Sequence, residues 1–182
     1  FGTNFGPSMV GALNLVSGQT HGATPGPEVV AGSVTGDPQP TGDVCTVRDS
    51  VSMSGRNIGN LLNDKGVSWG WFEGGFRTAD GKPACTQAHI GADGKPKVDY
   101  IAHHEPFQYY ASTANPHHLP VTSLAAIGTD TQSVVAGTPQ WNTANHQYDV
   151  SDFNSLVAAI AHGYLSPDHL PAVSFVKAPG YQ

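Results

Sequence analysis

The sequence is poor in basic residues, with 8 Lys and Arg against 14 Asp and Glu and a formal net charge of −6. It contains no run of Lys and Arg that could neutralise a phosphate backbone, so we expect no nucleic-acid partner. Long apolar runs are also missing. The longest, SLVAAIA at residues 155–161, is about a third of the ~20 residues that span a bilayer, and we expect no transmembrane segment.

Cysteine is scarce: Cys45 and Cys85 are the only two, and their spacing is far from a CxxC motif. A disulfide between them would close a loop of roughly 40 residues, stabilise the fold by roughly 3 to 4 kcal/mol and imply an oxidising compartment. The alternative is two unpaired thiols. Because free cysteines favour apolar interiors and these two lie in polar, Gly- and Pro-rich surroundings, we predict the disulfide.

Glycine and proline, in contrast, are abundant, with 22 and 14 of the 182 residues, so much of the chain is expected to be loop. A chain of this length suits one domain, which we place over residues 1–182. Periodicity is weak in residues 21–50, 73–100 and 128–148. Loops this long are uncommon in a compact domain unless they are functional or anchored elsewhere.

Two segments have the pattern of a helix followed by a strand. The apolar spacing in residues 54–66 predicts a helix that Ser54 caps and Gly66 ends, with a strand in residues 67–72. A second helix is predicted in residues 149–163, capped by Asp149 or Ser151, before a short strand at 172–176. Such units predict an α/β fold with a mainly parallel sheet sandwiched by helices.

The segment FGTNFGPSMVGALNLVSG suggests a third helix that begins directly after Pro7, since proline suits the first turn of a helix. Ser8 would then lie at a helix amino terminus, where free N–H groups and the dipole favour an anion. Two interpretations stay open from these residues alone: a simple capping turn, or a nucleophile or phosphate cradle.

The segment HHEPFQYYASTANPHHLP, residues 103–120, holds four of the nine histidines in two adjacent pairs. A histidine cluster is compatible with a catalytic device, a metal site or a hydrogen-bonded structural centre. The spacing lacks the HxxxH or HExxH pattern that places two metal ligands on one helical face. Lys177 lies at a predicted strand end, where sheet proteins often bind ligands, but a single lysine there is weak evidence.

Five blocks, in order along the chain, together resemble the bacterial phosphoesterase family of phospholipases C and acid phosphatases, a branch of the alkaline phosphatase superfamily. They are FGTNFGPSMVGALNLVSGQTHG, SMSGRNIGNLLNDKGVSWGWFEGGF, HHEPFQYYASTANPHHLP, NHQYDVSDF and LPAVSFVKAPGYQ. The resemblance implies an alkaline-phosphatase-like α/β sandwich and hydrolysis of a phosphate ester through a covalent phosphoserine. It places the nucleophile at Ser8.

The resemblance also implies one divalent metal ion, with Ser8 as a ligand and the other ligands outside this chain, so that the chain looks like an internal portion of a longer enzyme. His103, His104 and His146 resemble active-site histidines that bind phosphoryl oxygens or protonate the leaving group. We expect His117 and His118 to be structural, and Glu105 to orient an imidazole.

The implied substrate is a phosphate monoester or a phospholipid, and the implied location is periplasmic or secreted. An alternative is a noncatalytic fragment that binds phosphate or phospholipid, or an inactive remnant without metal ligands. The sequence leaves open the choice between phosphatase and phospholipase C, and also the oligomeric state.

Overall fold

The computed structural model of the chain describes residues 6–24 and 29–182. The helices are α1 (Ser8–Ser17), α2 (Ile58–Asp64) and α3 (Val150–Ala161), with 3-10 turns η1 (Ala102–His104), η2 (Pro106–Tyr109), η3 (Leu124–Ala126) and η4 (Pro167–His169). The strands are β1 (Val29–Val30), β2 (Ser33–Val34), β3 (Gln39–Pro40), β4 (Ser50–Val51), β5 (Trp69–Glu73), β6 (Ala88–Ile90), β7 (Pro96–Val98), β8 (Val134–Val135), β9 (Thr138–Pro139), β10 (Gln147–Asp149) and β11 (Val173–Lys177).

The central sheet is parallel and has the strand order β10–β5–β11. Because all three strands run the same way, Glu73, Asp149 and Lys177 lie at its carboxyl edge, while Trp69 and Val173 lie at its amino edge. The predicted α/β class with a parallel sheet is confirmed. That residues 1–182 form one incomplete domain stays a prediction.

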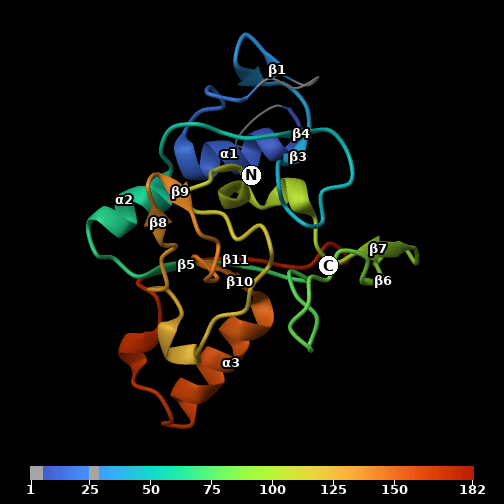
Figure 1. Cartoon of the computed structure of the whole chain (residues 1–182). Helices are drawn as coiled ribbons and strands as arrows, with labels where there is room; N and C mark the ends of the chain where they lie inside the picture. The colour runs from blue at the N-terminus through green and yellow to red at the C-terminus, as the bar shows by residue number, and fades with distance from the viewer. Residues whose placement is uncertain (1–5, 25–28) are drawn as a thin grey trace.

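The two faces of β5 pack against different helices, so every residue of this strand is buried. Trp69 and Trp71 join the cluster that includes α1, whereas Phe72 packs with Tyr148 and Leu156 of the α3 layer. Figure 1 shows the same arrangement, with α1 on one side of the sheet and α3 on the other. Trp69, Trp71 and Phe72 are therefore core residues.

The first helix-then-strand unit is present, but its predicted cap was wrong. Asn57 is the N-cap of α2: its side chain accepts a hydrogen bond from the Asn60 backbone N–H, and the Asn60 side chain accepts from the Asn57 backbone in return. Ser54 instead donates its hydroxyl to the Gly22 carbonyl at 2.9 Å. Gly66 follows the helix with a φ of +63°, as the pattern predicted.

The second unit agrees with its prediction. Asp149 caps α3 in a reciprocal arrangement with Asp152, and Gly163 follows with a φ of +74°. The loops contain short two-stranded ladders. The predicted disulfide between Cys45 and Cys85 is present and joins the loop that follows β3 to the loop that follows β5. None of the described helices is long and apolar enough to cross a membrane.

Candidate active site

Ser8 is the first residue of α1, directly after the N-cap residue Pro7, which has no side-chain acceptor to offer the helix. Asp37, far away in the sequence, supplies one. Its Oδ1 accepts a hydrogen bond from the Met9 backbone N–H at 2.8 Å and lies 3.4 Å from the exposed Ser8 hydroxyl oxygen. A carboxylate is stabilised by the positive end of the helix dipole. The Ser8 hydroxyl therefore faces a group that can accept its proton.

His103 and His104 form most of η1 and are half-buried, with ring centroids 4.5 Å apart in an edge-on arrangement. Arg48 Nη2 lies 3.2 Å from His103 Nδ1. Because a guanidinium only donates, His103 Nδ1 accepts this hydrogen bond and the ring proton resides on Nε2. His103 thus presents a neutral ring with an Nε2–H donor.

The pKa values of both imidazoles lie below their ordinary range. For His103 the main cause is burial, and the charges of Arg48 and Lys177 lower its pKa further while Asp37 opposes the shift. Burial, with His103 and Lys177 adding to it, lowers the pKa of His104 to about 4. Both rings are therefore neutral at neutral pH.

The structure brings three of the four predicted site residues together. The helix of Ser8, α1, packs against η1, which holds His103 and His104. Asp37 is close enough to raise the pKa of each imidazole, and the same carboxylate accepts the hydrogen bond from Ser8. Asp37 is thus the link between the hydroxyl and the two rings.

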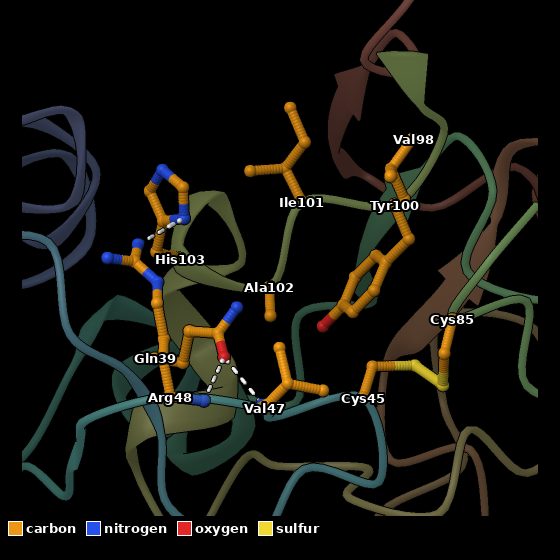
Figure 2. Close-up of a pocket in the computed structure, with 10 residues that line it drawn as sticks. All are labelled: Gln39, Cys45, Val47, Arg48, Cys85, Val98, Tyr100, Ile101, Ala102 and His103. Carbon is orange, nitrogen blue, oxygen red and sulfur yellow. Dashed lines mark hydrogen bonds between the residues drawn. A yellow bond between two sulfur atoms is a disulfide. The ribbon is translucent and has the colours of Figure 1, made fainter. Parts of the chain in front are cut away.

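A cavity of about 230 Å³ opens beside His103, as Figure 2 shows. His103 and Arg48 lie on one side of it, and the Cys45–Cys85 disulfide lies on the other. Gln39 holds the Arg48 segment in place, because its side-chain oxygen accepts the backbone N–H groups of Val47 at 2.8 Å and Arg48 at 3.2 Å. The cavity lies next to His103 and has room for a small organic group.

Glu105, which we expected to orient an imidazole, has different partners. Its Oε1 accepts the Phe107 backbone N–H at 3.2 Å, and burial together with the charge of Glu73 raises its pKa well above the ordinary value. The side chain is fully buried, and its hydrogen bonds among the described residues include none to an imidazole.

His146 lies in another part of the sheet. It directly precedes β10, at the amino edge, where its Nδ1 is 2.8 Å from the Trp69 carbonyl and its ring stacks on the Trp69 indole at 4.3 Å. Among the described residues its Nε2 has no hydrogen-bond partner, and burial lowers its pKa to about 4. The ring borders a separate cavity of about 190 Å³ that includes Ser68. None of these contacts joins it to Ser8, and its catalytic role stays a prediction.

His118 has the surroundings of a structural residue. Its Nδ1 donates to the Phe76 carbonyl at 2.7 Å, and its Nε2 donates to Asp43 at 3.2 Å. Asp43 also accepts from the Tyr100 hydroxyl and the Gln108 amide. His118 and Asp43 are thus a fully buried pair in which both ring nitrogens have hydrogen-bond partners.

Asp43, Cys45 and His118 place three donor atoms within 4.8 Å of one another, a group that could hold a metal ion. Their chemistry does not favour one. The sulfur of Cys45 is bonded to Cys85 and cannot act as a thiolate, and both ring nitrogens of His118 donate hydrogen bonds.

Around Ser8, the described residues offer the Ser8 hydroxyl and the Asp37 carboxylate as oxygen ligands. Hard divalent cations take about six or more. The described residues therefore do not form a complete metal site by themselves.

Asp37, Arg48 and Glu73 were not singled out by the sequence. Asp37 lies in the irregular run VTGDPQPTGD and Arg48 in the exposed segment after Cys45, and neither run has a periodic pattern. Glu73 directly follows the predicted strand 67–72 and ends the observed β5, and this position was the one available signal, because ligands gather at the carboxyl ends of parallel strands.

The model of the Phosphoesterase family matches residues 1–182, the full length of the chain. A search of the curated proteins finds no match. The site agrees with the family match, since a serine at a helix amino terminus, a carboxylate and neutral imidazoles are groups suited to phosphoryl chemistry. The chain therefore belongs to the Phosphoesterase family, and its general chemistry is that of a hydrolase acting on phosphate esters.

Proposed function

We propose that the protein hydrolyses phosphate esters of the phosphatase or phospholipase C type through a covalent phosphoserine at Ser8. The observation that supports this most is the contact between the Ser8 hydroxyl and the Asp37 carboxylate at the amino terminus of α1. A serine hydroxyl is a weak nucleophile until a nearby group accepts its proton.

In the first step, the Ser8 oxygen forms a bond to phosphorus while its proton passes to Asp37. The ester P–O bond breaks, and the alcohol leaves after taking up a proton from solvent. The developing negative charge on the phosphoryl oxygens lies near the first N–H groups of α1. In the second step, water attacks the phosphoserine, the Ser8 oxygen regains a proton and phosphate is released.

His103 serves this reaction as a hydrogen-bond donor rather than as an acid. Arg48 holds its Nδ1, which leaves Nε2–H to donate to a phosphoryl oxygen. His104 is neutral and can accept a proton from the attacking water. The cavity beside His103 offers about 230 Å³ for the alcohol part of the ester.

A divalent ion, when bound, would favour the serine alkoxide and draw charge from the phosphoryl oxygens. We include this ion in the proposal because the family resemblance implies it, with Ser8 as its ligand from this chain. A periplasmic or secreted location also belongs to the proposal, and the disulfide is compatible with it.

The test is turnover of p-nitrophenyl phosphate and of a phospholipid by Ser8→Ala, with Ser17→Ala at the other end of α1 as the matched control. We expect Ser8→Ala to lose at least about a thousandfold in kcat and Ser17→Ala to keep its activity. Unchanged turnover by Ser8→Ala would reject the mechanism. Phosphate binding without turnover by the wild-type protein would favour the noncatalytic alternative.

A further inference from the structure

A larger cavity, of about 330 Å³, is lined by residues that directly follow β3 and β4, by residues in and after η2, and by Trp141. The described residues that line it include neither Ser8 and Asp37 nor the His103–His104 pair, so it is distinct from the candidate active site. Its volume is about twice that of a cavity of ~150 Å³ that holds benzene. We call it the Trp141 cavity.

The inner wall of the Trp141 cavity is apolar. Met53, Tyr109 and Ala114 line it and are each 5% exposed or less. Met53 and Tyr109 belong to the main hydrophobic core, which makes this wall a firm one. The Tyr109 hydroxyl donates to the Pro38 carbonyl at 2.6 Å, so this hydrogen-bond donor is already used inside the protein.

The lining favours a ligand without charge. The Gln108 amide donates to Asp43 and to the Asn115 carbonyl and accepts from the Asn115 backbone N–H, and the Thr41 hydroxyl donates to Ser50. The described residues that line the cavity include no Asp, Glu, Lys or Arg. A charged group that entered would lose its hydration and gain no opposite charge, whereas an apolar group would gain from leaving water.

Trp141 forms the outer wall, since it lines the cavity and is 37% exposed. The edge of its indole faces the exposed His117, with the ring centroids 6.2 Å apart. Its backbone φ is +41°, a region that bulky residues avoid and glycine adopts without strain. Strained residues of this kind gather at ligand sites. The strain at this position therefore supports a role for the indole in ligand contact.

We propose that the Trp141 cavity binds an uncharged apolar small molecule, an aromatic ring or a short alkyl chain, between Met53 and Trp141. An indole offers a large flat contact area to such a group, and a methionine adapts its shape and packs well against aromatic rings. This binding goes beyond the proposed function and does not depend on phosphoester chemistry at Ser8.

The test uses the two methionines of the chain, Met9 and Met53, as reporters. Protein labelled with ¹³C at the methionine methyl groups gives two NMR signals, which Met9→Leu assigns. Met53 lines the cavity, and Met9, fully buried on α1, is the internal control. Indole, an uncharged two-ring molecule, should shift the Met53 signal saturably and the Met9 signal much less. A Met53 signal that does not move in millimolar indole, or equal shifts of both signals, would overturn the inference.

Variants then locate the ligand. Trp141→Gly suits the positive φ and removes the ring, so its affinity for indole should fall about tenfold or more. Tyr164→Ala, which removes an exposed aromatic ring elsewhere, is the matched control and should bind indole as the wild type does. Indole-3-acetate, which carries a negative charge, should bind the wild type at least about tenfold more weakly than indole.

Ser8→Ala should also bind indole as the wild type does, because the Trp141 cavity is separate from the serine. Lost binding in Ser8→Ala, unchanged affinity in Trp141→Gly, or equal affinities for indole and indole-3-acetate would overturn the inference. None of these results bears on turnover, so the mechanism at Ser8 is tested independently.

Discussion

The pairs His103–His104 and His117–His118 are the same dipeptide in one short segment, yet the fold gives them different surroundings. His103 and His104 are half-buried on η1, which packs against the helix of Ser8, and His103 borders a cavity. His118 is completely enclosed, with both ring nitrogens hydrogen-bonded within the protein. A histidine whose donors are all used inside the protein has none left for a substrate. The first pair is therefore suited to chemistry, whereas His118 of the second pair is suited to stability and His117 is exposed.

The largest expected effect is on stability, from the second pair. His118→Ala leaves the buried Asp43 carboxyl group without its imidazole partner, and we expect a loss of about 3 to 5 kcal/mol in the free energy of unfolding. Denaturant unfolding measures it. His117→Ala, at the exposed neighbouring position, is the control and should change stability by less than about 1 kcal/mol. Equal losses in the two variants would remove the distinction between the buried and exposed members of this pair.

The first pair should show the opposite pattern. His103→Ala and His104→Ala should each lower kcat/KM for p-nitrophenyl phosphate about 100-fold, because each removes a group that faces the phosphoryl site. Their free energies of unfolding should change by less than about 1 kcal/mol, since the rings are only half-buried. If both variants keep their activity and lose stability instead, the assignment of the first pair to chemistry is wrong.

His146 gives a third kind of behaviour, visible in the dependence of stability on pH. Burial lowers its pKa to about 4, below the ordinary value near 6.5, so the folded protein favours the neutral ring. The stability contribution is fully present above pH 6.5 and falls as the pH drops toward 4, because only the unfolded chain then binds the proton. The loss should reach roughly 3 kcal/mol.

The measurement is urea unfolding at several pH values between 7 and 4. His146→Phe keeps the stacking on Trp69 but not the titration, so its stability should fall less than that of the wild type over this range. His162→Asn, an exposed position, should follow the wild type. Parallel curves for the wild type and His146→Phe would show that His146 titrates normally.

The smallest expected effect tests the hydrogen bond between Arg48 and His103 Nδ1. Arg48→Ala removes a positive charge and the hydrogen bond to Nδ1, so the pKa of His103 should rise toward its ordinary value. We expect kcat to fall about two- to fivefold, as for one partly exposed hydrogen bond. NMR titration of the ring gives the pKa. Arg56→Ala, whose guanidinium pairs with Asp64, is the control, and a His103 pKa that moves equally in both variants would argue against the contact.

Local patterns in the sequence predicted the helices α2 and α3, because the signals that begin and end a helix lie within a few residues of its ends. The spacing of Ile58, Leu61 and Leu62, the caps of α3 and the glycines that end both helices are signals within a few residues of where they act. The one wrong cap, Ser54, shows the limit of such signals. Ser54 and Asn57 both have side chains suited to an N-cap and lie within one helical turn of each other. Ser54 donates to the distant Gly22 carbonyl, and Asn57 is the cap.

The candidate site could be predicted only in part, because its central contacts join distant segments. Ser8 and the histidine pair came from the family resemblance. Asp37 reaches Ser8 across 29 residues of irregular chain, and Arg48 reaches His103 across 55, so no spacing rule connects them. The raised pKa of Glu105 follows from burial and from the charge of Glu73, which are properties of the folded packing and not of either residue type.

The most direct test of the whole account is to trap the covalent intermediate at Ser8. Protein mixed with p-nitrophenyl phosphate is quenched in acid within the first turnover, digested and examined by mass spectrometry. The account predicts a phosphoryl group on Ser8, none on Ser17 of the same helix, and none in Ser8→Ala. Rapid turnover with an unmodified Ser8 at every quench time, or a phosphoryl group found on another residue, would contradict it.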